Sequence, residues 1–425
     1  MNKREYPHLD ETLFDTQLSN GLHVQVIPKR GFAKTYAFLA TNYGSIDTSY
    51  RYNGQAMTSP AGVAHYLEHK MFDLPDGNAM QLFARTGASP NAFTSYNMTA
   101  YYFVATEEVE ENLQNLLTFV YTPDFTEESV EKERGIIAQE IRMYEDSADS
   151  RDFELLAEAM YENHPLRVPI AGSVESIQDI TAQTLYDCHK SFYDPANMIL
   201  CVVGDVDPAR VVAIAEAHSP AGSQGAPERD YGPEEDLTPV KALNEACMEV
   251  SMPTFTIGFK SPVPKKGFDS FKTEIIGELA AEMLAGESSA LYSRLYDEGL
   301  VDADFSIGYE SLPGAAFLSA DGDSKDPKAV LQALLDEAKR LVSEGLDEDL
   351  FRRLKKSALG RRMRDLDSFE SICYRVCAYF FEGCDYLSFP GIYQAVSLQD
   401  VADFLADTVT VERAAMSVIY PKEKE

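Results

Sequence analysis

The sequence is short of basic residues. Among 425 residues, 37 Lys and Arg stand against 69 Asp and Glu, which gives a formal net charge of −32 at pH 7. Nucleic acid binding requires a basic surface that neutralises phosphates, so this balance argues against nucleic acid as a partner. It disfavours anionic membranes for the same reason. The acidity favours solubility, and it would also attract basic peptides into an acidic cavity.

Long apolar runs and clustered cysteines are also missing. No stretch approaches 18 uninterrupted apolar residues, and the basic start, Met1 to His8, is followed by no apolar run of signal-peptide length. The six cysteines are scattered, unlike the dense framework of a small secreted domain. We therefore expect a cytoplasmic protein that does not bind membranes, with reduced and buried cysteines. This includes Cys373 and Cys377, which lie one turn apart in a helical pattern.

The length predicts more than one domain, because single hydrophobic cores stop growing beyond roughly 250 to 300 residues. Residues 219–239 are rich in small residues, prolines and charge, and we interpret them as a linker. This divides the chain into domains 1–218 and 240–425. Ser176-Ile-Gln-Asp-Ile precedes the apolar run from Met198, and Ser397-Leu-Gln-Asp-Val precedes the run from Met416. This echo indicates an internal duplication.

Strand and helix patterns alternate irregularly along both halves and indicate α+β layers. Apolar, β-branched and aromatic runs predict strands over 21–28, 35–41 and 101–104, and helical spacing predicts helices over 61–72, 107–119 and 126–144. For the first of these helices, Ser59 offers an N-cap and Pro60 suits the first helical position. A long charged helix over 347–364 is the counterpart of that over 126–144.

The strongest chemical signal is His65-Tyr66-Leu67-Glu68-His69, which lies inside the first predicted helix. Two imidazoles at i and i+4 share a face, as two ligands of one metal require, and Glu68 lies on that face too. The order is that of the inverted zinc-peptidase signature, His-x-x-Glu-His. With only seven histidines, chance would produce it on the order of once in a hundred such chains. The competing interpretation is two surface histidines beside a salt-bridging glutamate.

A zinc ion held by two imidazoles and one carboxylate keeps an open position and lowers the pKa of a bound water to about 7, so that Glu68 could take its proton. The third ligand must come from elsewhere. Glu131, Glu133 and Glu140 on the helix over 126–144 are candidates. Glu140 has an apolar setting in which an unpaired carboxylate would be costly, and Glu133 is the next choice, as ligand or as a neighbour of the ligands.

At this point the chain resembles the pitrilysin and insulinase family of inverted zincins, which includes the mitochondrial processing peptidases, and most closely its half-length bacterial members. The resemblance covers nearly the whole chain. It rests on Leu18-Ser-Asn-Gly-Leu, His65 to Phe72, Gly87 to Tyr101, Glu133 with Glu140, and Asn197 to Asp205.

The resemblance implies that His65, His69 and Glu140 bind one zinc ion per chain, that Glu68 is the general base, and that Glu133 orients the site. It also implies two homologous α+β domains, each a mostly antiparallel sheet with helices packed on one side. In the family, the segment that matches Asn91, Ala92, Phe93 and Thr94 is an exposed strand edge to which an extended peptide substrate adds as a further strand. The alternative for this segment is a hairpin turn into a core strand.

One part of the family pattern is missing. Active members carry an Arg and a Tyr in the second domain that stabilise the oxyanion. Here the matching region places Tyr296 and Asp302 near those positions, and Arg294 is out of register. We therefore predict the metal-bearing half of a two-subunit endopeptidase for short or unfolded peptides, completed by a homologous subunit that supplies Arg and Tyr, or by a second copy. The alternatives are a non-hydrolytic scaffold subunit and a peptide-binding module with structural zinc.

Overall fold

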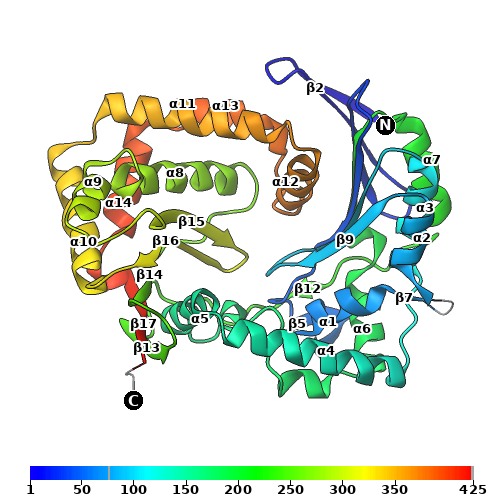
Figure 1. Ribbon diagram of the computed structural model, residues 1–425. Coiled ribbons are helices and arrows are strands. Elements are labelled where there is room, and N and C mark those ends of the chain that lie inside the picture. Colours follow the sequence, from blue (N-terminus) through cyan, green and yellow to red (C-terminus); the bar gives the residue numbers. More distant parts are fainter. Residues whose placement is uncertain (75–76, 423–425) are drawn as a thin grey trace.

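A computed structural model describes residues 1–74 and 77–422, and its two halves are each built on a mostly antiparallel sheet (Figure 1). The sheet of the first half has the strand order β1-β2-β3-β11-β4-β10-β9. The strands are β1 (Asn2–Tyr6), β2 (Glu11–Gln17), β3 (His23–Pro28), β4 (Thr35–Thr41), β9 (Ser89–Thr94), β10 (Thr99–Ala105) and β11 (Met198–Gly204). The strand β9, which contains the predicted substrate segment, therefore lies at one edge of this sheet.

Helices of the first half share an apolar core with one face of this sheet. They are α1 (Val63–Met71), α2 (Ala79–Arg85), α3 (Val109–Tyr121), α4 (Glu127–Glu145), α6 (Ala182–Phe192) and α7 (Pro208–His218). Strand residues alternate between the two faces, so that Leu39 belongs to this core while its neighbour Phe38 belongs to the core on the opposite face. Short strands complete the half: β5 (Ser49–Tyr52), β6 (Gln55–Thr58), β7 (Asp73–Leu74), β8 (Gly77–Asn78) and β12 (Glu228–Arg229).

The sheet of the second half repeats the topology of the first. Its order is β13-β17-β14-β16-β15, and the pair β13/β17 is parallel like β3/β11, while the other pairs in both sheets are antiparallel. The strands are β13 (Leu243–Met248), β14 (Thr254–Lys260), β15 (Ser306–Leu312), β16 (Ala315–Asp323) and β17 (Ala414–Pro421). The helices are α8 (Phe268–Ala285), α9 (Ala290–Asp297), α10 (Pro327–Glu344), α11 (Glu348–Asp365), α13 (Phe389–Ala395) and α14 (Leu398–Thr408). The predicted duplication is confirmed at the level of topology.

Two helices cross between the halves. The first-half helix α5 (Ala148–Met160) packs on the second sheet, where Leu156 and Met160 share a core with Phe317. The second-half helix α12 (Phe369–Phe381) packs on β4 and β11 of the first sheet. The helices α5 and α12 occupy equivalent positions in the order of elements of their own halves. Each covers the face of the opposite half's sheet that the helices of that half leave uncovered. The sequence predicted helices on one side of each sheet and missed this exchange, because helical spacing shows that a face is apolar but not which sheet it meets.

The predicted linker 219–239 contains the short strand β12, which pairs with β5 of the first half. The carboxylate of Glu235 accepts hydrogen bonds from the backbone N–H groups of Glu162, Asn163 and His164. The division into domains at this segment stays a prediction, since α5 precedes the segment and yet belongs to the second layer.

The cysteines are all free, but one expectation about them is wrong. Cys373 and Cys377 of α12 are buried against Cys201 of β11, as predicted for helical core thiols. Cys247, in contrast, is exposed, and Cys384 is only half-buried. Cys247 lies on β13, the edge strand of the second sheet, where a pleated strand presents alternate residues to solvent.

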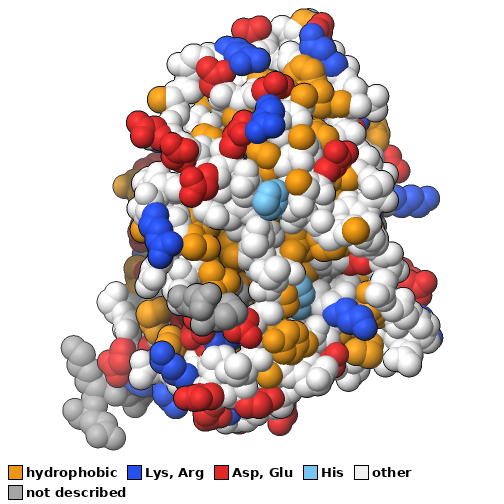
Figure 2. Space-filling model, turned by 90° about the vertical axis from the view of Figure 1, so that its right-hand side faces the viewer, with side chains coloured by type: hydrophobic (Ala, Val, Ile, Leu, Met, Phe, Trp, Pro, Cys, Tyr) orange, Lys and Arg blue, Asp and Glu red, His pale blue; other side chains and the backbone are white. Residues whose placement is uncertain are grey.

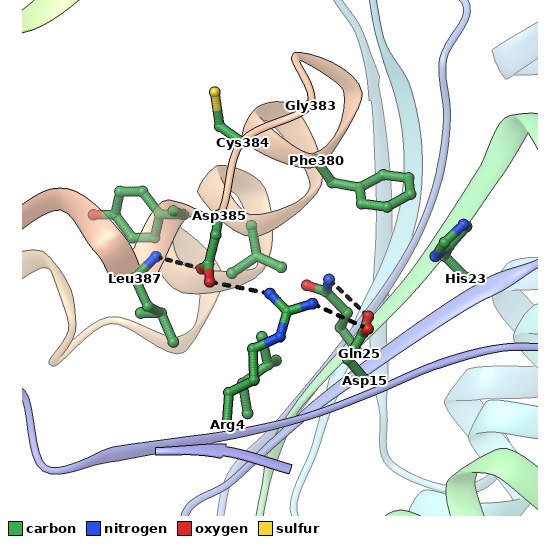
Figure 3. A pocket seen from close by; sticks show the side chains of 12 residues that line it. Arg4, Asp15, His23, Gln25, Phe380, Gly383, Cys384, Asp385 and Leu387 are labelled. Carbon is green, nitrogen blue, oxygen red and sulfur yellow. Dashed lines mark hydrogen bonds and ion pairs between the residues drawn. The ribbon is translucent and has the colours of Figure 1, made fainter. Parts of the chain in front are cut away.

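An N-terminal hairpin fastens the two halves on the side away from β9. Arg4 of β1 forms ion pairs with Asp15 of β2 and with Asp385, which follows α12. The Tyr6 hydroxyl also donates to Asp385. Arg4, Asp15 and Asp385 line a cavity of about 300 Å³, and Figure 3 shows the Arg4 guanidinium between the two carboxylates. The cation is shared by two carboxylates, so the hairpin links the halves and leaves Arg4 no free valence for an anionic ligand.

The first helix begins later than the sequence predicts. Ser59 and Pro60 do not cap it; α1 begins at Val63, and Gly62 precedes it with a positive φ of 87°. A Cβ atom at Gly62 would lie 2.3 Å from the carbonyl oxygen of Ala171. Glycine is therefore required here both for the left-handed backbone and for the close approach of the loop around Ala171.

Within residues 1–74 and 77–422, no helix has the length and apolar character needed to cross a membrane. On the outer face of the first half, basic side chains are scattered singly among acidic and apolar ones (Figure 2).

The crossing helix α5 predicts a pH effect on stability. Asp152 is buried against the second sheet, where it accepts a hydrogen bond from Thr256, and burial raises its pKa from 3.8 to about 6. The protonated carboxyl therefore stabilises the folded state at low pH, and this contribution is lost as the pH rises from about 4 to about 6. Asp152→Asn should gain on the order of 2 kcal/mol of unfolding free energy relative to wild type between pH 4 and pH 7. Urea unfolding at both pH values measures this. Asp304→Asn, at an exposed position of the second half whose charge does not act on Asp152, is the control; equal pH profiles for wild type and Asp152→Asn would contradict the prediction.

Candidate active site

Helix α1 carries three of the predicted site residues on a largely buried segment. Residues 63–71 contain no glycine or proline, so the helix is uninterrupted, and His65, Glu68 and His69 face the same cavity. The His65 and His69 rings lie 4.6 Å apart between centroids. The predicted i, i+4 pairing of the imidazoles is confirmed in the helix geometry.

Helix α4 brings the third donor to these rings. Thr126 caps α4 through a reciprocal capping box with Ser129, which fixes where the helix begins. Two turns beyond Glu133, Glu140 places its Oε1 atom 3.5 Å from Nε2 of His65 and its Oε2 atom 3.5 Å from Nε2 of His69. The hydrogen bond from His65 is the main cause that lowers the pKa of Glu140 to about 2, against the opposing effect of burial. Glu140 is therefore an ionised carboxylate at neutral pH.

Glu133 holds the outer side of His69. Its Oε1 atom lies 3.0 Å from Nδ1 of the ring. Burial, the largest single effect, lowers the pKa of His69, but the hydrogen bond to Glu133 and the charges of Glu68, Glu140 and Glu133 together raise it above its ordinary value. Glu131, the remaining sequence candidate, is exposed and pairs with Arg134 instead of the imidazoles.

The donor set fits a zinc ion. His65, His69 and Glu140 each offer one ligand atom, and these atoms all lie within 4.8 Å of one another. Zinc bonds of about 2.0 to 2.2 Å at tetrahedral angles hold their ligands about 3.3 to 3.5 Å apart, close to the two separations from Glu140. A neutral His69 that donates Nδ1–H to Glu133 turns a lone pair at Nε2 toward the Glu140 carboxylate, an arrangement that needs a cation between the two groups. The buried Nδ1 atom of His65 has no hydrogen-bond partner within the described residues, so this ring is held from its Nε2 side.

Glu68 stands beside this donor set without joining it. The Thr94 hydroxyl of β9 donates a hydrogen bond of 2.7 Å to its Oε2 atom. The other carboxylate oxygen of Glu68 remains available, and the Glu68 side chain is held facing the cavity. Thr94 was predicted as a substrate-binding residue; its hydroxyl orients Glu68, which nothing in the sequence pattern indicated.

The site opens into a cleft of about 900 Å³, whose lining residues all lie between residues 65 and 173. One wall is formed by α1, α4 and β9, and the other by the first turns of the crossing helix α5 and the loop that contains Ala171. Acidic side chains predominate: Glu68, Glu140, Glu145 and Glu154 line the cleft against a single cation, Arg151, which pairs with Glu154 and Glu158. The exchange of helices thus supplies the second wall of the cleft.

Three of the four predicted substrate-segment residues, Ala92, Phe93 and Thr94, line the cleft, whereas the side chain of Asn91 does not. On the side opposite β10, β9 has no strand partner among the described residues.

Tyr144 was missed by the sequence reasoning: its hydroxyl donates a hydrogen bond of 2.9 Å to Glu140. Its i+4 spacing from Glu140 on one helix could have indicated it. For the α5 residues in the cleft the sequence carried no such signal.

The second-half residues considered for oxyanion stabilisation lie elsewhere. Arg294 and Tyr296 belong to α9, which packs on α8 and α10 at the outer end of the second half, far from α1 and α4 (Figure 1). Neither these residues nor Asp302 lines the cleft.

Two histidines and a glutamate around a helix-borne His-x-x-Glu-His sequence, on a duplicated α+β fold, match the arrangement that characterises inverted zinc peptidases. Comparison with known proteins agrees. Residues 54–174 match the family described as Insulinase (Peptidase family M16), and residues 179–358 match the Peptidase M16 inactive domain.

The chain is 38% identical to the uncharacterized zinc protease YmfH of Bacillus subtilis (strain 168) over 424 residues, which cover 98% of this chain and 99% of that protein. A putative M16-like peptidase from Alicyclobacillus acidocaldarius has a crystal structure that superposes with a TM-score of 0.93 at 33% identity, covering 99% of this chain and all of the other. The chain therefore belongs to the insulinase family, peptidase family M16. The crystal structure of pitrilysin shares the fold alone, with a TM-score of 0.77 at 18% identity over 99% of this chain and 46% of that one.

The contact between Glu133 and His69 predicts a change in titration. Because the hydrogen bond to Glu133 raises the pKa of His69, Glu133→Gln should lower that pKa in the metal-free protein. Titration of the imidazole signals by NMR measures it. Glu131→Gln removes a charge two residues away on the same helix and should leave the His69 midpoint where it was; an equal shift in both variants would show a general field effect instead.

Proposed function

We propose that this protein is a zinc-dependent endopeptidase that hydrolyses short or unfolded peptides as the metal-bearing half of a two-subunit enzyme. The observation that carries the proposal is the convergence of His65, His69 and Glu140 beside a separately oriented Glu68, at the wall of a cleft that runs along a free strand edge.

A zinc ion held by His65, His69 and Glu140 would act as a Lewis acid that polarises a peptide carbonyl and lowers the pKa of water. The side chains of the protein transfer the proton and orient the metal ligands. Glu68, kept in place by the Thr94 hydroxyl, accepts the proton from the attacking water and can pass it to the departing amine. Glu133 keeps Nε2 of His69 free for the metal by accepting a hydrogen bond from Nδ1–H, and the Tyr144 hydroxyl orients Glu140 by donating a hydrogen bond to it.

The substrate is proposed to bind as an added strand. The free edge of β9 offers backbone hydrogen bonds to an extended peptide, and Ala92, Phe93 and Thr94 face the same cleft as the metal donors. Backbone pairing makes few demands on sequence but requires the peptide to be extended. Folded proteins, whose backbone groups are already paired, should therefore resist cleavage. The excess of carboxylates in the cleft favours basic peptides.

A second subunit is proposed because the chain has no cation free to stabilise the oxyanion within the described cleft. Arg151 is engaged by two carboxylates, and α9 is remote. The chain also matches less than half the length of pitrilysin, whose fold it shares. A homologous subunit or a second copy that faces the cleft would supply the missing Arg and Tyr and close a chamber around the peptide. The free cysteines favour a reducing compartment, so we place this enzyme in the cytoplasm.

Replacement of the base separates metal binding from chemistry. Glu68→Gln keeps the three metal donors, so zinc should remain near one ion per chain by elemental analysis. Cleavage of a quenched, unstructured peptide should fall by at least about 100-fold, as expected for loss of a general base. Glu131→Gln is the control for loss of a carboxylate outside the cleft. Equal cleavage by wild type and Glu68→Gln would rule out this mechanism, and absence of zinc from both would favour a scaffold subunit.

Completion of the site by a partner predicts a concentration effect. The peptidase activity of the chain per mole should rise with its concentration if a second copy completes the site, or on addition of a homologous subunit that lacks His-x-x-Glu-His. Activity assays across a dilution series, paired with sedimentation analysis, measure this. Full activity of a monomer at every concentration would contradict the two-subunit proposal while leaving the zinc site intact.

A further inference from the structure

Lys70 is a completely buried cation that none of the steps above uses. It follows His69 directly in α1, and its side chain has no solvent exposure. Lysine is almost never fully buried unless it is paired, because removal of an ammonium group from water is costly. A buried lysine directly beside His69 therefore needs interactions that offset the free energy of its desolvation.

The contacts of Lys70 tie three elements together. Its ammonium donates to the carboxylate of Asp73 in β7 and, at 3.3 Å, to the backbone carbonyl of Ser129 in the first turn of α4. One turn earlier on α1, the buried hydroxyl of Tyr66 donates to the backbone carbonyl of Val130, the next residue of α4. Tyr66 and Lys70 are at i and i+4, so they form a second stripe on α1 next to the stripe of His65 and His69.

The two stripes of α1 contact one helix in order. Tyr66 and Lys70 hold the first turn of α4, His69 meets Glu133 one turn further, and both histidines meet Glu140 two turns beyond that. The position of Glu140 relative to the imidazoles therefore depends on how the beginning of α4 is fixed against α1. A metal site tolerates displacements of only about 0.5 Å in its donors.

We propose that Tyr66 and Lys70 act as a clamp, a pair of positioning residues whose bonds to the first turn of α4 set the separation of Glu140 from His65 and His69 and so the affinity of the site for zinc. The inference rests on the proposed zinc site and adds to it the residues that set its geometry. A core lysine with a purely structural role would affect stability alone; the clamp affects the metal even where stability is unchanged.

Lys70→Met tests the clamp, because methionine fills much of the same volume, carries no charge and cannot bond Ser129. The measurements are the zinc dissociation constant, by competition with a chromophoric chelator at fixed pH, and the visible absorption spectrum of the Co²⁺-substituted protein, which reports donor geometry. Zinc affinity should fall about 10- to 100-fold, the range found for residues that orient metal ligands, and the Co²⁺ bands should shift. With peptide substrate, kcat should fall while KM is unchanged.

Lys260→Met is the matched control. Lys260 is also buried and also donates to a backbone carbonyl, that of Met160 in α5, but it does not contact α1 or α4. It should keep the zinc affinity of wild type. Tyr66→Phe removes the other bond of the clamp at almost no change in volume, and should weaken zinc binding in the same direction; it decides the matter if Lys70→Met does not fold.

The outcomes are distinct. Wild-type zinc affinity and Co²⁺ spectra in folded Lys70→Met, or in Tyr66→Phe if Lys70→Met does not fold, would overturn the clamp and leave the zinc site standing. Equal losses in Lys70→Met and Lys260→Met would overturn it too, because they would show a general effect of removing a buried lysine. Failure of the wild-type protein to bind zinc would refute the proposed function itself.

Discussion

The packing of α1 against α4 is the contact on which the site depends. The histidines lie on one helix and Glu140 on the other, and a metal can join them only if the interhelical distance holds the donor atoms 3.5 Å apart. That distance is set away from the metal, by the capped first turn of α4, by Glu133 against His69, and by the buried bonds from Tyr66 and Lys70.

The exchange of α5 and α12 gives the site its surroundings. Each sheet buries one face under its own helices and the other under a helix of the opposite half, so neither half has a complete core alone. Burial of both faces requires the halves to stay together, and the Arg4 bridge between Asp15 and Asp385 fastens the junction on the other side. Helix α5, which packs on the second sheet, thus forms one wall of the cleft at the entrance to the site.

The second half shows what the same helix pair does without a metal motif. The helices α8 and α11 take the places of α1 and α4 in the order of elements, and they too are joined by polar side chains. Arg362 of α11 bonds Glu274 and Glu278, an i, i+4 pair on α8, at 2.5 and 2.7 Å. In the first half, two imidazoles face a carboxylate, and a metal cation is needed between them. In the second half, two carboxylates face a guanidinium, which is itself the cation. The equivalent helix pairs of the two halves are therefore joined by different polar groups, and only the pair α1 and α4 carries metal donors.

The sequence by itself determined the helix that carries His65, Glu68 and His69 and the helix that carries Glu133 and Glu140, because spacing along one helix fixes which side chains share a face. It also indicated the duplication, whereas the strand edge at Asn91 to Thr94 was implied only by the family resemblance. From the residues alone it ranked Glu140 ahead of Glu133 as the third ligand but could not fix the choice, since that depends on the angle between two helices; the family resemblance supplied it. Only the tertiary structure decided that Thr94 orients Glu68, that Gly62 rather than Ser59 precedes α1, that Cys247 is exposed, and that α5 and α12 change places. Each of these depends on contacts between segments far apart in the chain, which periodicity cannot encode.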